Sequence, residues 1–218
     1  MSQSDLKKIL SEGLRQLNLA QPLDDKQQDK LIKYVELLNK WNKAYNLTAV
    51  RKPEQMVVRH LLDSLSISPF IQGEKILDVG TGAGLPGIPL AILYPERHFT
   101  LLDSNSKKTR FVVQASSELE LPNIDVVQSR VEEFQPTDGF DTVVTRAYSA
   151  VGNMVEQTSH LLLDDGVFLA MKGVNPITEI EELAAAYIVK ENHVIAVPGL
   201  EEERHLLEIK VKKEYTAL

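Results

Sequence analysis

The chain has 218 residues, 43% of them hydrophobic, which is enough for one large domain with a core of its own. It contains no cysteine, so disulfides, thiolate metal sites and cysteine nucleophiles are excluded. The net charge of −7 argues against indiscriminate binding of nucleic acid, but the charge is unevenly distributed. Residues 1–70 hold 11 lysines and arginines against 8 acidic residues, which leaves 13 against 23 for the remainder. A local basic region favours a folded RNA that docks on one face.

The first 70 residues have the apolar spacing of helices. Apolar residues recur at helical intervals between 6 and 17 and between 31 and 45, the second run behind an acidic cap at Asp24 or Asp25. A third helical segment is expected between Pro53 and Pro69. We therefore predict a helical extension over residues 1–70. There is no signal peptide and no run of about eighteen apolar residues, so a cytoplasmic protein with no membrane partner is expected.

From residue 75 onward the pattern changes to short apolar runs separated by helical stretches. The expected strands are 75–79, 98–103, 124–128, 140–145, 166–171, 193–197 and 206–211. The expected helices are near 86–94, 105–119, 149–163 and 176–187. This alternation predicts an α/β domain over residues 71–218, with a mostly parallel, doubly wound sheet of seven strands covered by helices on both faces. Only about eight residues join the last two strands, too few for a crossover helix, so the last strand is expected to be antiparallel.

A glycine-rich segment follows the first strand. It reads Asp78-Val79-Gly80-Thr81-Gly82-Ala83-Gly84-Leu85-Pro86-Gly87, and its glycines permit a sharp turn and a close approach to a ligand. Asp103 ends the second strand, where its carboxylate can accept both ribose hydroxyl hydrogens. These two features fit NAD as well as S-adenosylmethionine. Asp78 favours the second, because a carboxylate at the mouth of the loop repels a pyrophosphate and attracts an ammonium and a sulfonium.

Ligands in such sheets bind beyond the carboxyl ends of the strands, so the later strand ends are further candidates. Val131 and Glu132 follow the third strand and can meet an adenine edge, although a solvated helix start explains them equally well. Arg146 ends the fourth strand and Lys172 ends the fifth, where a surface charge is the plainer interpretation of Lys172.

If the ligand is S-adenosylmethionine, the end of the fourth strand also restricts which atom of a substrate is expected to accept the methyl group. The segment Thr145-Arg146-Ala147-Tyr148 lacks the Asn/Asp-Pro-Pro-Tyr loop common in amino-methylating enzymes, and without cysteine a thiolate adduct at a pyrimidine is impossible. A ring nitrogen such as guanine N7 has a free lone pair and needs only positioning, with a nearby arginine or lysine to dock the base or its phosphates. The five histidines show no ligand spacing, so no metal site is expected.

Several strings together carry a resemblance to a known family. They are Lys40–Thr48, Arg59–Ser64, Asp78–Pro89, Leu101–Ser104, Ser129–Phe134, Thr145–Ala147, Lys172–Gly173 and Glu203–His205. Between about residues 5 and 213 the chain resembles bacterial ribosomal RNA small subunit methyltransferase G, also called glucose-inhibited division protein B.

The resemblance implies a Rossmann-like class I methyltransferase that transfers a methyl group from S-adenosylmethionine to N7 of a guanosine, position 527 in the 530 loop of 16S ribosomal RNA. It implies cofactor contacts at Gly80, Leu85, Val131, Glu132 and Arg146, to which the glycine-rich segment adds Asp78 and Gly82 and the end of the second strand adds Asp103. Lys172 and Arg204 match the basic residues of the family's site and, with Arg146, are the candidate catalytic residues.

The partner is expected to be 16S ribosomal RNA or the small ribosomal subunit, and the chain is expected to be a monomer. Two alternatives remain open at this point. One is a non-catalytic RNA-binding or ribosome-assembly module, and the other is a nicotinamide-dependent oxidoreductase.

Overall fold

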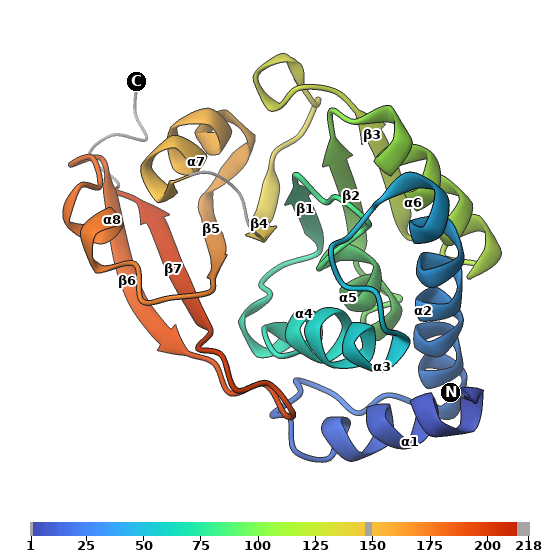
Figure 1. Cartoon of the computed structure of the whole chain (residues 1–218). Helices are drawn as coiled ribbons and strands as arrows, with labels where there is room; N and C mark the ends of the chain where they lie inside the picture. The colour runs from blue at the N-terminus through green and yellow to red at the C-terminus, as the bar shows by residue number, and fades with distance from the viewer. Residues whose placement is uncertain (1, 147–149, 213–218) are drawn as a thin grey trace.

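A computed structural model of the chain describes residues 2–146 and 150–212. A seven-stranded sheet with the strand order β3-β2-β1-β4-β5-β7-β6 forms its centre (Figure 1). The strands are β1 (Lys75–Val79), β2 (His98–Asp103), β3 (Ile124–Gln128), β4 (Phe140–Arg146), β5 (Leu162–Lys172), β6 (Tyr187–Val194) and β7 (His205–Val211). Strands β1 to β5 pair in parallel, and β7 runs antiparallel to both β5 and β6. The predicted fold class, with its antiparallel last strand, is confirmed.

Two hydrophobic clusters lie on opposite faces of this sheet, because successive side chains of a strand point to opposite sides. In β1, Ile76 belongs to one cluster and Leu77 to the other. The helices are α1 (Gln3–Leu14), α2 (Asp25–Tyr45), α3 (Pro53–Met56), α4 (Asp63–Leu65), α5 (Gly87–Leu93), α6 (Ser106–Glu118), α7 (Val151–Thr158) and α8 (Ile177–Glu181). The N-terminal helices, α5 and α6 cover the first cluster, and α7 covers the second.

The N-terminal helices share the core of the sheet. Helix α2 begins at the predicted Asp24 cap, whose side chain accepts a hydrogen bond from the amide of Gln27. The buried hydroxyl of Tyr34 on α2 donates to the carbonyl of Ala83 in the glycine loop at 2.7 Å. Helix α2 is therefore fixed against the glycine loop. The predicted division into a helical extension over residues 1–70 and a domain over 71–218 stays a prediction.

Between α3 and α4 the chain forms a π-helical segment, Val57–Leu62. Segments of this kind are rare and often occur at functional sites, because the wider turn changes the direction of the side chains that follow. Arg59 and His60 lie in this segment, and Asp63 comes directly after it. No described helix is long and apolar enough to cross a membrane.

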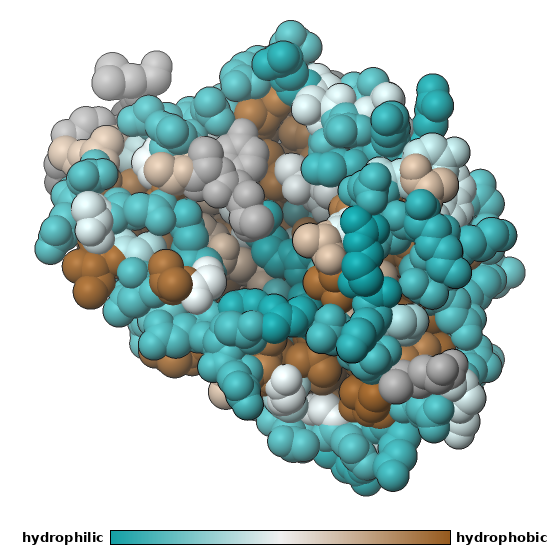
Figure 2. All heavy atoms as spheres, in the orientation of Figure 1, coloured by the Kyte–Doolittle hydropathy of each residue, from teal (hydrophilic) through white to brown (hydrophobic). Residues whose placement is uncertain are grey.

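The sequence misplaces the elements at the β6 edge. The helix expected over 176–187 is only the short α8, and the strand expected at 193–197 is β6, Tyr187–Val194. Strand β5 also begins at Leu162 rather than at 166. Pairing with β7, which sets Tyr187 opposite Val211, outweighs the helical propensity of the alanines before it. The surface over α2 and α6, at the other end of the sheet, is largely hydrophilic (Figure 2).

Candidate cofactor site and the adjoining cavity

The carboxyl ends of β1, β2 and β3 enclose a pocket of about 190 Å³. The residues that line it are Val79, Gly80, Leu102, Asp103, Ser104, Ser129, Arg130, Val131 and Glu132. Four predicted cofactor residues, Gly80, Asp103, Val131 and Glu132, therefore come together. Gly80 turns with a φ of +69°, a conformation that favours glycine.

Asp103 connects the glycine loop to the end of β2. Its Oδ2 accepts a hydrogen bond from the amide of Gly82 at 2.9 Å, and its Oδ1 accepts one from the amide of Asn105 at 2.8 Å. Lys108 lies 3.6 Å from Oδ2. A carboxylate has about four acceptor positions, so capacity for ribose hydroxyls remains beside these bonds. The predicted ribose contact of Asp103 stays a prediction that this geometry supports.

Asp78 lies beneath the glycine loop and not at its mouth, as the sequence had suggested. Its side chain is fully buried, and Oδ2 accepts hydrogen bonds from the Thr81 hydroxyl at 2.6 Å and the Gly87 amide at 2.9 Å. Burial raises the pKa of Asp78 to about 6, against these two hydrogen bonds, which lower it. A Cβ atom at Gly87 would come within 2.8 Å of the same oxygen. Asp78 thus holds the loop and the start of α5 together.

Two other loop residues of the prediction differ in their surroundings. A Cβ atom at Gly82 would meet no atom nearer than 3.9 Å, so space is open beside it, and its φ is +62°. Leu85 is buried in the hydrophobic core under the loop. Its contact with a cofactor stays a prediction.

The helix N-terminus after the glycine loop does not suit the pyrophosphate of a dinucleotide. In dinucleotide-binding folds the pyrophosphate occupies the helix N-terminus after the glycine loop. Here the carboxylate of Asp78 already accepts the Gly87 amide at the start of α5, and an anion beside it would be repelled. This arrangement argues against the nicotinamide-dependent oxidoreductase.

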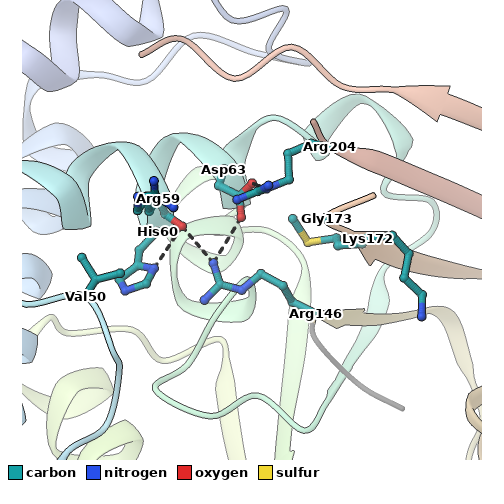
Figure 3. Close-up of a pocket in the computed structure, with 9 residues that line it drawn as sticks. Val50, Arg59, His60, Asp63, Arg146, Lys172, Gly173 and Arg204 are labelled. Atoms are coloured by element: carbon teal, nitrogen blue, oxygen red, sulfur yellow. Dashed lines mark hydrogen bonds and ion pairs between the residues drawn. The ribbon is translucent and has the colours of Figure 1, made fainter. Parts of the chain in front are cut away.

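A second cavity, of about 360 Å³, opens at the carboxyl ends of β4 and β5 and the start of β7. Figure 3 shows the side chains that line it. They are Val50, Arg59, His60, Asp63, Arg146, Met171, Lys172, Gly173 and Arg204. The three candidate catalytic residues, Arg146, Lys172 and Arg204, therefore line one cavity. Ala147 and Tyr148, which follow Arg146, lie outside the described residues.

Arg146 and Arg204 both bind the carboxylate of Asp63. Arg146 Nη1 lies 3.3 Å from Oδ2, and Arg204 Nε donates to Oδ1 at 2.9 Å. Arg146 also donates to the backbone carbonyl of Arg59 at 3.2 Å. Asp63 is only 3% exposed, so this buried charge is offset by two guanidinium groups.

Lys172 binds a different acidic residue. Its Nζ donates to Glu179 Oε2 at 2.8 Å, and Glu179 also accepts from the amide of Val151. Burial raises the pKa of Glu179, but the hydrogen bonds from Lys172 and Val151 outweigh it and lower the pKa overall. In Figure 3 the ammonium group of Lys172 points away from Arg146 and Asp63.

His60 holds the loop that covers the cavity. Its Nδ1 lies 3.0 Å from the carbonyl of Arg59 and its Nε2 lies 2.9 Å from the Thr48 hydroxyl. Because a carbonyl only accepts, Nδ1 carries the hydrogen and Nε2 accepts from Thr48. Burial, and secondarily the charge of Arg146, lowers the pKa of His60 to about 4, so the ring is neutral near pH 7.

Sequence reasoning gave no role to Asp63, His60 or Arg59, although all three lie in a string that supported the resemblance. One signal was present for Asp63. It is an acidic residue within the apolar run Leu61-Leu62-Asp63-Ser64-Leu65, and a charge on a buried helix face needs a partner. Which residues serve as partners could not be predicted from the spacing.

A family model described as rRNA small subunit methyltransferase G matches residues 27–207. The chain belongs to this family. Relatives named ribosomal RNA small subunit methyltransferase G from Saccharophagus degradans and Shigella dysenteriae are each 53% identical to it over 88% of its length, covering 86% and 93% of theirs. A third, from Ectopseudomonas mendocina, is 52% identical over 91% of this chain and 92% of its own.

Solved structures show the same fold at low sequence identity. The glycopeptide N-methyltransferase MtfA complexed with S-adenosyl-L-homocysteine has a TM-score of 0.61 at 13% identity, covering 70% of this chain and 87% of its own. A SAM-dependent methyltransferase from Aquifex aeolicus has a TM-score of 0.57 at 16% identity, covering 79% and 97%. The predicted family and, with it, the prediction of a methyltransferase that uses S-adenosylmethionine are confirmed.

Proposed function

We propose that this methyltransferase transfers the methyl group of S-adenosylmethionine to N7 of a single guanosine, position 527 in the 530 loop of 16S ribosomal RNA. The observation that carries the proposal is the position of the cavity lined by Arg146, Lys172 and Arg204, called the cation-lined cavity from here on. It opens at the same edge of the sheet as the pocket at β1 to β3, and the β4 strand that bears Arg146 is the direct neighbour of β1. A base held in this cavity lies next to a cofactor held in that pocket.

The residues of the cavity fit a nucleophile that needs no deprotonation. Both ring nitrogens of His60 are hydrogen bonded, and the carboxylate of Asp63 binds two arginines. Neither group is disposed to remove a proton from a substrate. Guanine N7 has its lone pair in the plane of the ring and carries no hydrogen, so it can attack a methyl group without a general base.

In the proposed step the bond between sulfur and the methyl carbon breaks as the bond between the methyl carbon and N7 forms. S-adenosylmethionine supplies the electrophilic methyl group, and the positive charge moves from sulfur to the guanine ring. Arginine or lysine donors can bind guanine O6 or the flanking phosphates, and orientation of the base accounts for much of the acceleration. Arg204 and Lys172 are proposed for this task, and Arg146 for the carboxylate of the cofactor.

The target lies inside a folded RNA, so the guanosine must leave its stack to enter the cavity, as bases do in other base-modifying enzymes. The proposed partner is 16S ribosomal RNA, free or within the small subunit. A monomer acting in the cytoplasm, without a metal, completes the proposal. Among the described residues, no group of three or more His, Asp or Glu side chains is placed to hold a metal ion.

Methyl transfer to defined RNA tests the proposal. The protein is incubated with S-adenosylmethionine carrying a labelled methyl group and with 16S RNA, either free or assembled in small subunits from a strain that lacks this chain. We expect one labelled guanosine in the 530 loop, modified at N7 and found by nuclease mapping with mass spectrometry. A labelled exocyclic nitrogen or ribose would contradict the chemistry, and RNA binding without label would favour the non-catalytic module.

A further inference from the structure

Three charged side chains from distant parts of the chain meet at the wall of the cavity. Asp63 lies on α4, Arg146 at the end of β4, and Arg204 just before β7. The two ion pairs span 83 and 141 residues of sequence. Asp63 therefore connects the N-terminal helices to the end of β4 through Arg146 and to the residue before β7 through Arg204.

We propose that Asp63 is a positioning residue for methyl transfer. It fixes the guanidinium groups of Arg146 and Arg204 so that the first meets the cofactor and the second meets the RNA base in one geometry. The inference rests on the proposed function, and it concerns a side chain that acts through the two arginines and not on the substrate itself.

The burial of Asp63 explains why it can impose this geometry. A carboxylate that is 3% exposed cannot exchange its partners for water without cost, so both guanidinium groups stay with it. Ion pairs of this kind contribute little net stability compared with apolar residues of similar volume, whereas the loss of one member leaves an unpaired buried charge. Orientation of the arginines is therefore the better explanation of the cluster.

Each arginine is held by some of its guanidinium donors, and other donors remain available. Arg204 uses Nε for Asp63 and Nη1 for the carbonyl of Glu203, and Arg146 uses Nη1 for both Asp63 and the carbonyl of Arg59. A guanidinium group has five N–H donors in a rigid plane. Once one side is bound, the direction of the remaining donors is fixed as well. The cluster keeps one net positive charge, which suits an anionic cofactor group or an RNA.

The central test replaces Asp63 by asparagine, which keeps the size and removes the charge. We expect the rate of single-turnover methyl transfer to fall about a hundredfold, since small displacements of positioning groups have effects of this size. The affinities for S-adenosylhomocysteine and for the RNA should change by less than about tenfold. Asp63→Glu restores the carboxylate and should recover at least about tenfold of the lost rate. Asp138→Asn removes an exposed ion pair with Lys75 and is the matched control, which should retain the wild-type rate.

A double-variant cycle separates positioning from a merely structural role. Arg204→Lys keeps the positive charge but loses the Nε contact with Asp63, and we expect its transfer rate to fall by at least about tenfold. If Asp63 acts through Arg204, the Asp63→Asn and Arg204→Lys double variant should be no more than about threefold slower than the slower single variant. Effects that multiply, or wild-type rates in Asp63→Asn or in Arg204→Lys, would overturn the inference.

The inference can be tested even if the Asp63→Asn variant does not fold. If Asp63→Asn does not fold, as thermal melting will show, Arg204→Lys at the partly exposed Arg204 still decides, because a fully active lysine variant shows that the Asp63-held geometry is dispensable. The proposed function is judged separately, on the wild-type protein and the same RNA. Absence of wild-type methyl transfer would count against the proposed function, whereas a normal wild type with a normal Asp63→Asn variant would count against the role of Asp63 alone.

Discussion

The pocket at β1 to β3 and the cation-lined cavity share one edge of the sheet but are built in different ways. The pocket is lined by three short segments, 79–80, 102–104 and 129–132, each at the end of a strand. The cavity takes its lining from five segments spread between residues 50 and 204. A site made of consecutive strand ends is local in sequence and can be recognised by its motif. A site assembled across the fold shows itself only in the structure.

The difference extends to the groups that stabilise each site. At the pocket, backbone amides bind carboxylates: the Gly82 amide binds Asp103 in the pocket wall, and the Gly87 amide binds Asp78 beneath the glycine loop. In the cavity, side chains bind other side chains: Asp63 binds Arg146 and Arg204, and Lys172 binds Glu179. Variants of the pocket should therefore affect the cofactor, and variants of the cavity, apart from Arg146 with its proposed contact to the cofactor carboxylate, should affect transfer to RNA. Each prediction below can break that separation.

The largest effect is expected at Gly80. Valine there is strained, because a β-branched residue rarely adopts a φ of +69°, and its side chain would occupy the pocket. We expect Gly80→Val to lose more than about a hundredfold in affinity for S-adenosylhomocysteine, measured by calorimetric titration, while RNA affinity changes by less than about threefold. Gly152→Val is the control, since nothing lies within 4 Å of a Cβ atom at Gly152. Unchanged cofactor affinity in Gly80→Val would show that the cofactor does not bind in this pocket.

The opposite selectivity is expected on the cavity side. Arg204→Ala should keep the affinity for S-adenosylmethionine within about threefold, while single-turnover methyl transfer falls by roughly ten- to a thousandfold. Lys172→Ala should lie at the lower end of this range, because its ammonium group is bound to Glu179 and points away from Arg146. The wild-type rate should stay nearly constant from about pH 6 to 8.5, without a general-base limb. A tenfold rise in rate per pH unit, or full activity in both variants, would contradict this mechanism.

These two sites also show what the sequence could predict. The structure brings Gly80, Asp103, Val131 and Glu132 into one pocket, because strand ends in a parallel sheet meet at one edge, and their cofactor contacts stay a prediction. Asp78 was correctly located on the strand but wrongly placed at the mouth of the loop. Its hydrogen bonds to Thr81 and Gly87 depend on how the loop closes, which residue spacing does not specify.

The cavity was harder to predict, because its key contacts join residues far apart in the sequence. Arg146, Lys172 and Arg204 were chosen as cations near strand ends and through the resemblance, but their acidic partners were not. The pairs of Asp63 depend on where α4 packs against the sheet. The β6 edge was misplaced for the same reason, since a nonlocal pairing with β7 decided it.

Of the two sites, the cavity side should show a pH-dependent loss of stability at His60. The folded pKa of about 4 lies below the ordinary value of 6.5, so between these values the unfolded chain binds a proton that the folded protein does not. Stability from this group is therefore complete above about pH 6.5 and is lost as the pH falls towards 4, by at most about 3 kcal/mol.

His60→Gln removes this titration. The difference in unfolding free energy between wild type and His60→Gln, measured by urea denaturation, should shrink by up to about 3 kcal/mol from pH 7 to pH 4. Because the comparison subtracts every group that the two proteins share, the opposite contribution of Asp78, whose folded pKa is raised to about 6, cancels. A difference that stays constant with pH would show that His60 is not held neutral between Arg59 and Thr48.

The smallest expected effect concerns the basic N-terminal region, residues 1–70, in which lysines and arginines outnumber acidic residues by 11 to 8. Lys40 and Lys43 are exposed near the end of α2. Because both are exposed, the plain interpretation is two solvated helix lysines. If they contact phosphates, each releases about one counterion on binding, and the double variant Lys40→Ala with Lys43→Ala should flatten the logarithmic salt dependence of RNA affinity by at most about two units. The measurement is RNA affinity between about 50 and 200 mM salt. Lys75→Ala at the start of β1, at the opposite end of this strand from the pocket, is the control, and its slope should match that of wild type. A double variant with the wild-type slope would show that these lysines of α2 do not belong to the RNA-binding face. Recognition of the RNA would then rest on the cavity and its arginines, and the pocket and the cavity together would account for substrate binding.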